Sequence, residues 1–203
     1  GCHESAYTEF SFDISGLVQP GKNTIAVQVD NRPTEVKWPN DWGYGVYGGI
    51  HRDVFVEVYG GDYLADIVLT PDYDVERKQG VLSITGTAKD ISAFTVKLGE
   101  TEQMITCCDS QFSAQLRFDA ITPWSSEAPV LYSVSISAGE TVYKSCKIGF
   151  RNAKFTDGKF FLNGQPTYLK GVCYVYDSPK YGLVMAREQL TEDLSKMKAA
   201  NVD

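Results

Sequence analysis

The sequence lacks the marks of several large protein classes. Its 26 acidic residues outnumber its 19 lysines and arginines, which gives a net charge of −7. A nucleic-acid-binding surface needs the opposite, a basic face. No apolar run is long enough to cross a lipid bilayer, and no low-complexity tract or flexible linker is present. We therefore expect neither a nucleic-acid partner nor a membrane partner.

Cysteine and histidine are too few and too scattered for a metal site. The 2 histidines are His3 and His51, and the 5 cysteines are Cys2, Cys107, Cys108, Cys146 and Cys173. The number of cysteines is odd, and their spacing matches no zinc-binding pattern. The sequence predicts reduced, mostly buried thiols, and no metal or cofactor.

Apolar and polar residues alternate through most of the first 60 residues. The alternation is clearest at residues 10–14, 25–29 and 54–58, and it predicts strands with one wetter face. Between the second and third, residues 31–49 form a long loop rich in aromatic side chains. Long loops of this kind are uncommon unless they are functional. Three strands do not close a core, so we expect further strands before Gly1 in a longer protein.

The middle of the chain predicts a second β unit. Its seven short strand candidates are residues 67–70, 81–87, 94–98, 104–107, 112–118, 132–137 and 142–148. That number of short strands in nearly ninety residues is typical of an immunoglobulin-like β-sandwich. The Cys–Trp–Cys signature of antibody domains is absent, so the prediction concerns the architecture alone.

In the last 54 residues, the spacing of apolar residues changes from the two-residue period of strands to the 3.6-residue period of a helix. Asn163-Gly164 predicts a type I′ hairpin turn, because both central residues of that turn need φ > 0. Residues 167–175 form an apolar run typical of a buried strand, and a helix is expected from about Ala186. A single β/α unit cannot bury its own faces. We therefore expect this unit to belong to a larger α/β body, with the chain cut at both ends.

Four groups of motifs, in order along the chain, resemble glycoside hydrolase family 2, the β-galactosidase, β-glucuronidase and β-mannosidase group. They are YTEFSFDIS from Tyr7, GGIHRDV from Gly48, WSSEAPVLY from Trp124, and the group GFR from Gly149, LNGQP from Leu162 and KGV from Lys170. We refer to these as the family segments. The resemblance covers the whole chain, and several motifs in register are far more specific than one.

The resemblance implies a mainly β chain built from three parts. Residues 1–61 would be the C-terminal part of a jelly-roll sandwich, residues 62–149 an immunoglobulin-like β-sandwich, and residues 150–203 the first β/α unit of a (β/α)8 barrel. The family hydrolyses terminal β-linked sugars with retention, using a pair of glutamates. Its acid/base glutamate normally follows an asparagine, and no Asn-Glu pair occurs here. We expect the catalytic pair to lie beyond residue 203 and this segment alone to be inactive.

Three residues are candidates for the substrate pocket by the same resemblance. Asp41 and Trp42 lie in the long aromatic loop, where family members often send a carboxylate into the active site; a loop anchored by its own aromatics is the alternative. Asp177 follows the first barrel strand, and a solvated loop acid is the alternative there. In that loop Cys173 and Val175 replace the family's Asn and His, which indicates altered specificity or a lost sugar contact.

Two other functions remain open on the sequence. A non-catalytic carbohydrate-binding or scaffold protein would use the same sandwiches, and an extracellular adhesion sandwich would explain the first 148 residues but not the β/α unit. Carbohydrate is the expected partner of the longer protein. Unpaired strand edges at the cut ends also predict self-association of the segment.

Overall fold

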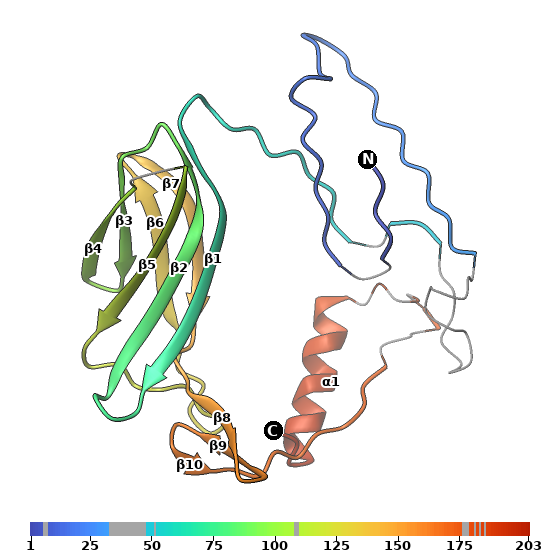
Figure 1. The fold of residues 1–203 in the computed structure, drawn as a ribbon. Coiled ribbons are helices and arrows are strands. Elements are labelled where there is room, and N and C mark those ends of the chain that lie inside the picture. The colour runs from blue at the N-terminus through green and yellow to red at the C-terminus, as the bar shows by residue number, and fades with distance from the viewer. Residues whose placement is uncertain are drawn as a thin grey trace. The chain divides into compact units, whose positions relative to one another are not determined.

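The computed structural model describes residues 1–5, 8–32, 48–50, 52–107, 110–175, 179–180, 182, 184 and 186–203. These residues divide into two units, Gly1–Phe55 and Val56–Asp203. All ten strands and the helix found in the described residues belong to the second unit (Figure 1). No described helix has the length and apolar character that a bilayer crossing requires.

The seven strands predicted in the middle of the chain are all present. They are β1 (Tyr63–Asp74), β2 (Gln79–Lys89), β3 (Ala93–Leu98), β4 (Thr101–Thr106), β5 (Gln111–Phe118), β6 (Tyr132–Ala138) and β7 (Thr141–Ile148). They form one sheet in the order β1-β2-β5 and another in the order β4-β3-β6-β7, with antiparallel neighbours throughout. In the constant-type immunoglobulin fold the fourth strand lies on the first sheet. Here a two-residue turn at Gly99 and Glu100 keeps β4 beside β3 instead.

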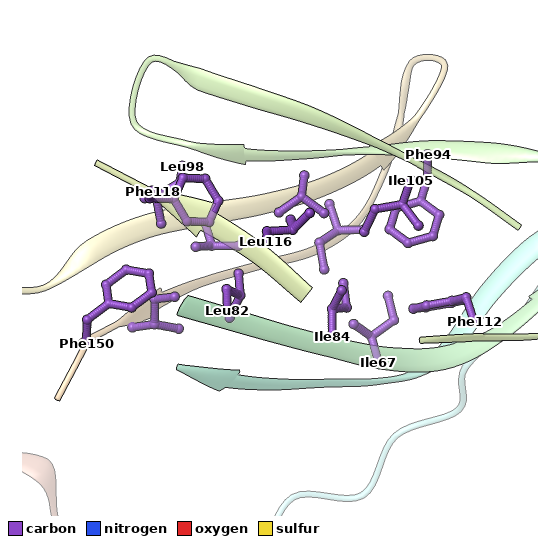
Figure 2. Packing of buried hydrophobic residues seen from close by; sticks show 14 of the residues in the cluster. Ile67, Leu82, Ile84, Phe94, Leu98, Ile105, Phe112, Leu116, Phe118 and Phe150 are labelled. Atoms are coloured by element: carbon purple, nitrogen blue, oxygen red, sulfur yellow. The ribbon is translucent and has the colours of Figure 1, made fainter. Parts of the chain in front are cut away.

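The core lies between the two sheets and is built from the inward residues of each alternating strand. Leu82 and Ile84 of β2 face Val96 of β3 and Ile136 of β6, and all four side chains are completely buried. Figure 2 shows Phe94 and Phe112 at one end of this core, where their ring centroids are 4.7 Å apart. Phe150, which follows β7, fills the other end and is 0% exposed.

A small sheet of three short strands follows the sandwich. β8 (Ala153–Thr156), β9 (Lys159–Leu162) and β10 (Gln165–Pro166) pair in sequence order. Asn163 and Gly164 have φ angles of 52° and 79°, which confirms the predicted type I′ turn. Asp157 and Gly158, with φ of 51° and 70°, form a second such turn that the sequence analysis missed.

The strand predictions for the first 60 residues are wrong for the described residues. No strand is present at 10–14, 25–29 or 54–58, and Ile25, Val27 and Val29 are exposed. Alternation shows which face of a strand would be apolar, but a strand exists only when a neighbouring chain accepts and donates its backbone hydrogen bonds. Most of the predicted long loop, residues 33–47, lies outside the described residues.

The prediction of a buried strand at residues 167–175 is also wrong. No strand is assigned there, and Leu169, Val172 and Val175 are each more than half exposed. The predicted helix is confirmed as α1 (Arg187–Ala199), with Glu188 in its first turn and Lys196 and Lys198 in its last. No residue of α1 is buried. The spacing of apolar residues is compatible with burial in residues 167–175 and in α1. Burial also needs neighbouring residues to cover these segments, and few described residues do so.

The expectation of mostly buried thiols is wrong as well. Cys2 and Cys173 are exposed free thiols, whereas Cys107 and Cys146 are half-buried. Cys173 is exposed because it lies in the same uncovered segment as Val172. Cys108 lies outside the described residues.

Candidate functional site

The three predicted pocket residues, Asp41, Trp42 and Asp177, all lie outside the described residues. Their role in binding substrate therefore stays a prediction. Two other places in the second unit gather residues of the family segments. One is the contact between the sandwich and the β8–β10 sheet. The other is the contact between the segment before α1 and α1 itself.

The first place, which we call the joint, consists of Asp72, Trp124, Asn152 and Asn163 with their immediate neighbours. It brings together three stretches of the family segments that are far apart in the sequence. The Trp124 amide donates to the carbonyl of Phe150 at 2.7 Å, and the Thr122 amide donates to the hydroxyl of Tyr132 at 2.8 Å. These bonds hold the irregular segment that leads to β6 against the end of β7.

Two asparagines connect the sandwich to the small sheet. The Asn163 side chain accepts from the Asn152 amide at 2.9 Å and donates to the Trp124 carbonyl at 3.0 Å. The Asn152 side chain in turn donates to the Asp72 carboxylate of β1 at 3.0 Å. Asn152 is the one buried polar residue among the described residues. Burying an amide is tolerated only when its hydrogen bonds are made, and here they are.

The indole of Trp124 is held from two further sides. The Arg151 guanidinium lies 5.4 Å from the ring centroid, a cation–π contact. A Cβ atom at Gly149 would come within 3.2 Å of the Trp124 side chain, so a larger residue at this position would have to displace the indole slightly. The polar atoms of the joint thus bind each other. The joint can orient the small sheet, but it presents no group poised for chemistry.

The second place lies around α1. The Tyr174 hydroxyl donates to the Asp193 carboxylate at 2.7 Å, and Gln189 donates to the same carboxylate at 3.1 Å. The hydrogen bond from Tyr174 lowers the pKa of Asp193, and the same bond raises the pKa of Tyr174. Tyr174 lies between Cys173 and Val175 in the segment that precedes α1. The structure uses its hydroxyl to tie the preceding segment to α1.

The chain returns beside that segment after α1 ends. The Asp203 amide donates to the Lys170 carbonyl at 3.0 Å, and the Lys170 amide donates to the Asp203 carboxylate, also at 3.0 Å. The amide of Lys170 lowers the pKa of Asp203. The sequence contained no signal for this pairing, because it joins residues 33 positions apart.

The described carboxylates with shifted pKa values do not suit the role of a catalytic acid. Hydrogen bonds lower the pKa of Asp13, Asp74, Asp193 and Asp203. The general acid of a glycosidase needs a raised pKa, so that it still carries a proton near neutral pH. The described residues also contain no cluster of three His, Cys, Asp or Glu side chains able to hold a metal ion.

The fold is similar to part of the fold of solved β-glucuronidases. The enzyme from Parabacteroides merdae superposes with a TM-score of 0.63 at 19% identity, covering 78% of this chain and 22% of that one. β-Glucuronidase 3 from Bacteroides uniformis superposes with a TM-score of 0.64 at 22% identity, covering 76% and 21%. At these identities the likeness concerns the fold.

Sequence comparison identifies the same group. No protein-family model matches the chain. The β-galactosidases of Priestia megaterium and Streptococcus thermophilus are each 29% identical over 100% of this chain, and the one from an Arthrobacter strain is 32% identical over 95%. The chain spans about a fifth of the length of these relatives, from 18% to 22%. The resemblance drawn from the motifs is confirmed: the chain is related to the β-galactosidases and β-glucuronidases of glycoside hydrolase family 2.

Proposed function

We propose that this chain is a segment of a retaining β-glycosidase that removes terminal β-linked sugars. One observation carries the proposal. The match to proteins named β-galactosidase runs through the whole of this chain rather than through one motif. All of the family segments therefore fall inside one alignment that covers the whole chain.

The three-part architecture belongs to the same proposal. Residues 1–61 would complete a jelly roll with strands from elsewhere in the protein, and residues 62–149 are the sandwich. Residues 150–203 would open a (β/α)8 barrel. The bonds between Lys170 and Asp203 support the last part, because they bring the chain after α1 back beside the segment that precedes α1, which is the path of the chain in a β/α unit.

The catalytic pair would lie outside these 203 residues. Two carboxyl groups must be about 5–5.5 Å apart for hydrolysis with retention, one as acid/base and one as nucleophile. The chain has no Asn-Glu pair, and the lowered pKa values of Asp193 and Asp203 leave both ionised near neutral pH. Asp41, Trp42 and Asp177 would contribute to substrate binding, with carboxylates accepting from sugar hydroxyls and the indole covering a ring face.

A non-catalytic carbohydrate-binding protein is the second candidate. Cys173 and Val175 stand where the family has Asn and His, and Val175 is 53% exposed. A valine cannot hydrogen-bond a sugar hydroxyl. If these positions face the pocket of the whole protein, its substrate preference or its catalysis has changed.

The test is turnover by the full-length protein that carries this segment. We expect hydrolysis of at least one of the aryl β-galactosides, β-glucuronides and β-mannosides, with the β-anomer as the first product seen by NMR. The 203-residue chain assayed beside it should give no turnover. A full-length protein without turnover on any of the three would refute the proposal and favour the binding protein. Turnover by the short chain would refute the placement of the catalytic pair.

A further inference from the structure

We propose that the β1–β2–β5 sheet binds saccharide chains where β1 begins. The surface, which we call the tyrosine patch, consists of Tyr59, Tyr63, Asp66, Thr87 and Gln111. Tyr63 is paired with Lys89 and Thr87 with Gln111 in the sheet ladders, so these residues meet at one end of the three strands.

The two tyrosines supply the apolar part of the patch. Their ring centroids are 4.8 Å apart with 37° between the ring planes, and Tyr59 is 46% exposed. The Lys89 ammonium lies 5.8 Å from the Tyr63 ring centroid. The Tyr59 hydroxyl donates a hydrogen bond to the Glu57 carboxylate, which raises the pKa of Tyr59 to about 12. An exposed aromatic ring suits the C–H face of a sugar.

A bulge in β1 brings a carboxylate to the same surface. The pairing of β1 with β2 shifts between Ala65 and Val68, and Asp66 at this point has a φ of 52°. Bulges redirect side chains, and a non-glycine residue with positive φ is uncommon. The Asp66 carboxylate accepts from the Thr87 hydroxyl at 3.1 Å. Thr87 lies two residues before Lys89, which is the cross-strand partner of Tyr63.

Hydrogen-bonding groups line a shallow groove beside the carboxylate. The groove has a volume of about 460 Å³, and its polar lining residues are Asp66, Thr85, Thr87, Gln111 and Ser113. Hydroxyl and amide groups can both accept from and donate to sugar hydroxyls, and a carboxylate accepts from them. A saccharide has apolar C–H faces, which can pack on the aromatic rings, and hydroxyls, which can hydrogen-bond to the polar groups of the groove. An apolar ligand would leave these groups unpaired.

The choice of saccharide as ligand rests on the proposed function, because a β-glycosidase that also holds neighbouring sugar units keeps its substrate close. The binding itself needs no catalytic residue. It is therefore tested on this chain directly, by following backbone amides by NMR while a soluble β-1,4-linked galactotetraose is added. We expect shifts at Tyr63, Thr87 and Gln111, with a dissociation constant on the order of 1 mM.

Substitutions inside and outside the tyrosine patch distinguish binding at the patch from nonspecific binding elsewhere on the surface. Tyr59→Ala and Tyr63→Ala should each weaken binding about tenfold, whereas Tyr63→Phe should keep it, since the ring makes the contact. Tyr168→Ala is the matched control, because Tyr168 is 84% exposed and lies outside the patch. Gln111→Ala, at an exposed position, should weaken binding even if a tyrosine variant fails to fold.

Two results would overturn the proposal. One is the absence of shifts at the patch; the other is equal weakening by Tyr168→Ala and Tyr63→Ala. The outcome is distinct from that of the turnover test. A full-length protein that hydrolyses aryl glycosides, together with a chain that binds no tetraose, would support the proposed function and refute the tyrosine patch.

Discussion

Replacing Asn163 tests whether the joint holds the small β8–β10 sheet on the sandwich. Asn163→Gly is the cleanest change, because glycine adopts the positive φ of 52° without strain and keeps the type I′ turn. It removes both side-chain bonds, the one accepted from Asn152 and the one donated to Trp124. Because the turn is retained, any change in the stability of the small sheet comes from the loss of the contacts in the joint.

The expected magnitude follows from the two lost bonds. Each hydrogen bond contributes about 1 kcal/mol net, so the small sheet should lose about 2 kcal/mol of stability against local opening. That loss corresponds to an approximately 30-fold higher open population. Asn163→Ala should cost about 1 kcal/mol more, since alanine resists the left-handed conformation.

Amide hydrogen exchange is the suitable assay because it reads each segment separately. The amides of Lys154 and Phe161, which face each other in the β8–β9 ladder, should exchange about 30-fold faster in Asn163→Gly, while that of Ile84 in the sandwich core stays protected. Asp157→Gly is the matched control, since Asp157 lies in a second type I′ turn, at the opposite end of β9 from Asn163. Unchanged exchange in Asn163→Gly, or an equal increase in Asp157→Gly, would refute the role assigned to the joint.

Two further predictions concern the core and α1. Phe150→Ala should destabilise the sandwich by about 3–5 kcal/mol in chemical denaturation, because Phe150 is fully buried. Phe155→Ala, at a 79% exposed position, should change the free energy of unfolding by no more than about 0.5 kcal/mol. Similar losses in the two variants would contradict the assignment of Phe150 to the core. The lowered pKa of Asp193 means that its bond with Tyr174 stabilises at pH values above the ordinary aspartate range and is lost as the pH falls through the lowered pKa. Tyr174→Phe should therefore raise the pKa of Asp193 in a carboxyl NMR titration, and an unchanged value would show that another group sets it.

The sequence by itself determined the features that depend on near neighbours. Alternation located β2, β5 and β6, because a half-buried strand needs one apolar face whatever its partner is, and the other four strands of the sandwich were found as shorter strand candidates. The Asn163-Gly164 turn followed from the φ angles that those two residue types allow. The motifs also pointed to the family that the comparisons confirm. The candidate pocket residues Asp41, Trp42 and Asp177 lie outside the described residues and stay predictions.

Tertiary structure alone decided which apolar segments are covered and which polar groups meet. Residues 25–29 and 167–175 have strand-like patterns, yet neither forms a strand among the described residues, because a pattern supplies no hydrogen-bonding partner. The bond from Asn163 to Trp124 spans 39 positions, and the tyrosine patch depends on a bulge that places Asp66 beside Thr87. Contacts of this kind depend on the register between distant strands, which local residue preferences do not encode.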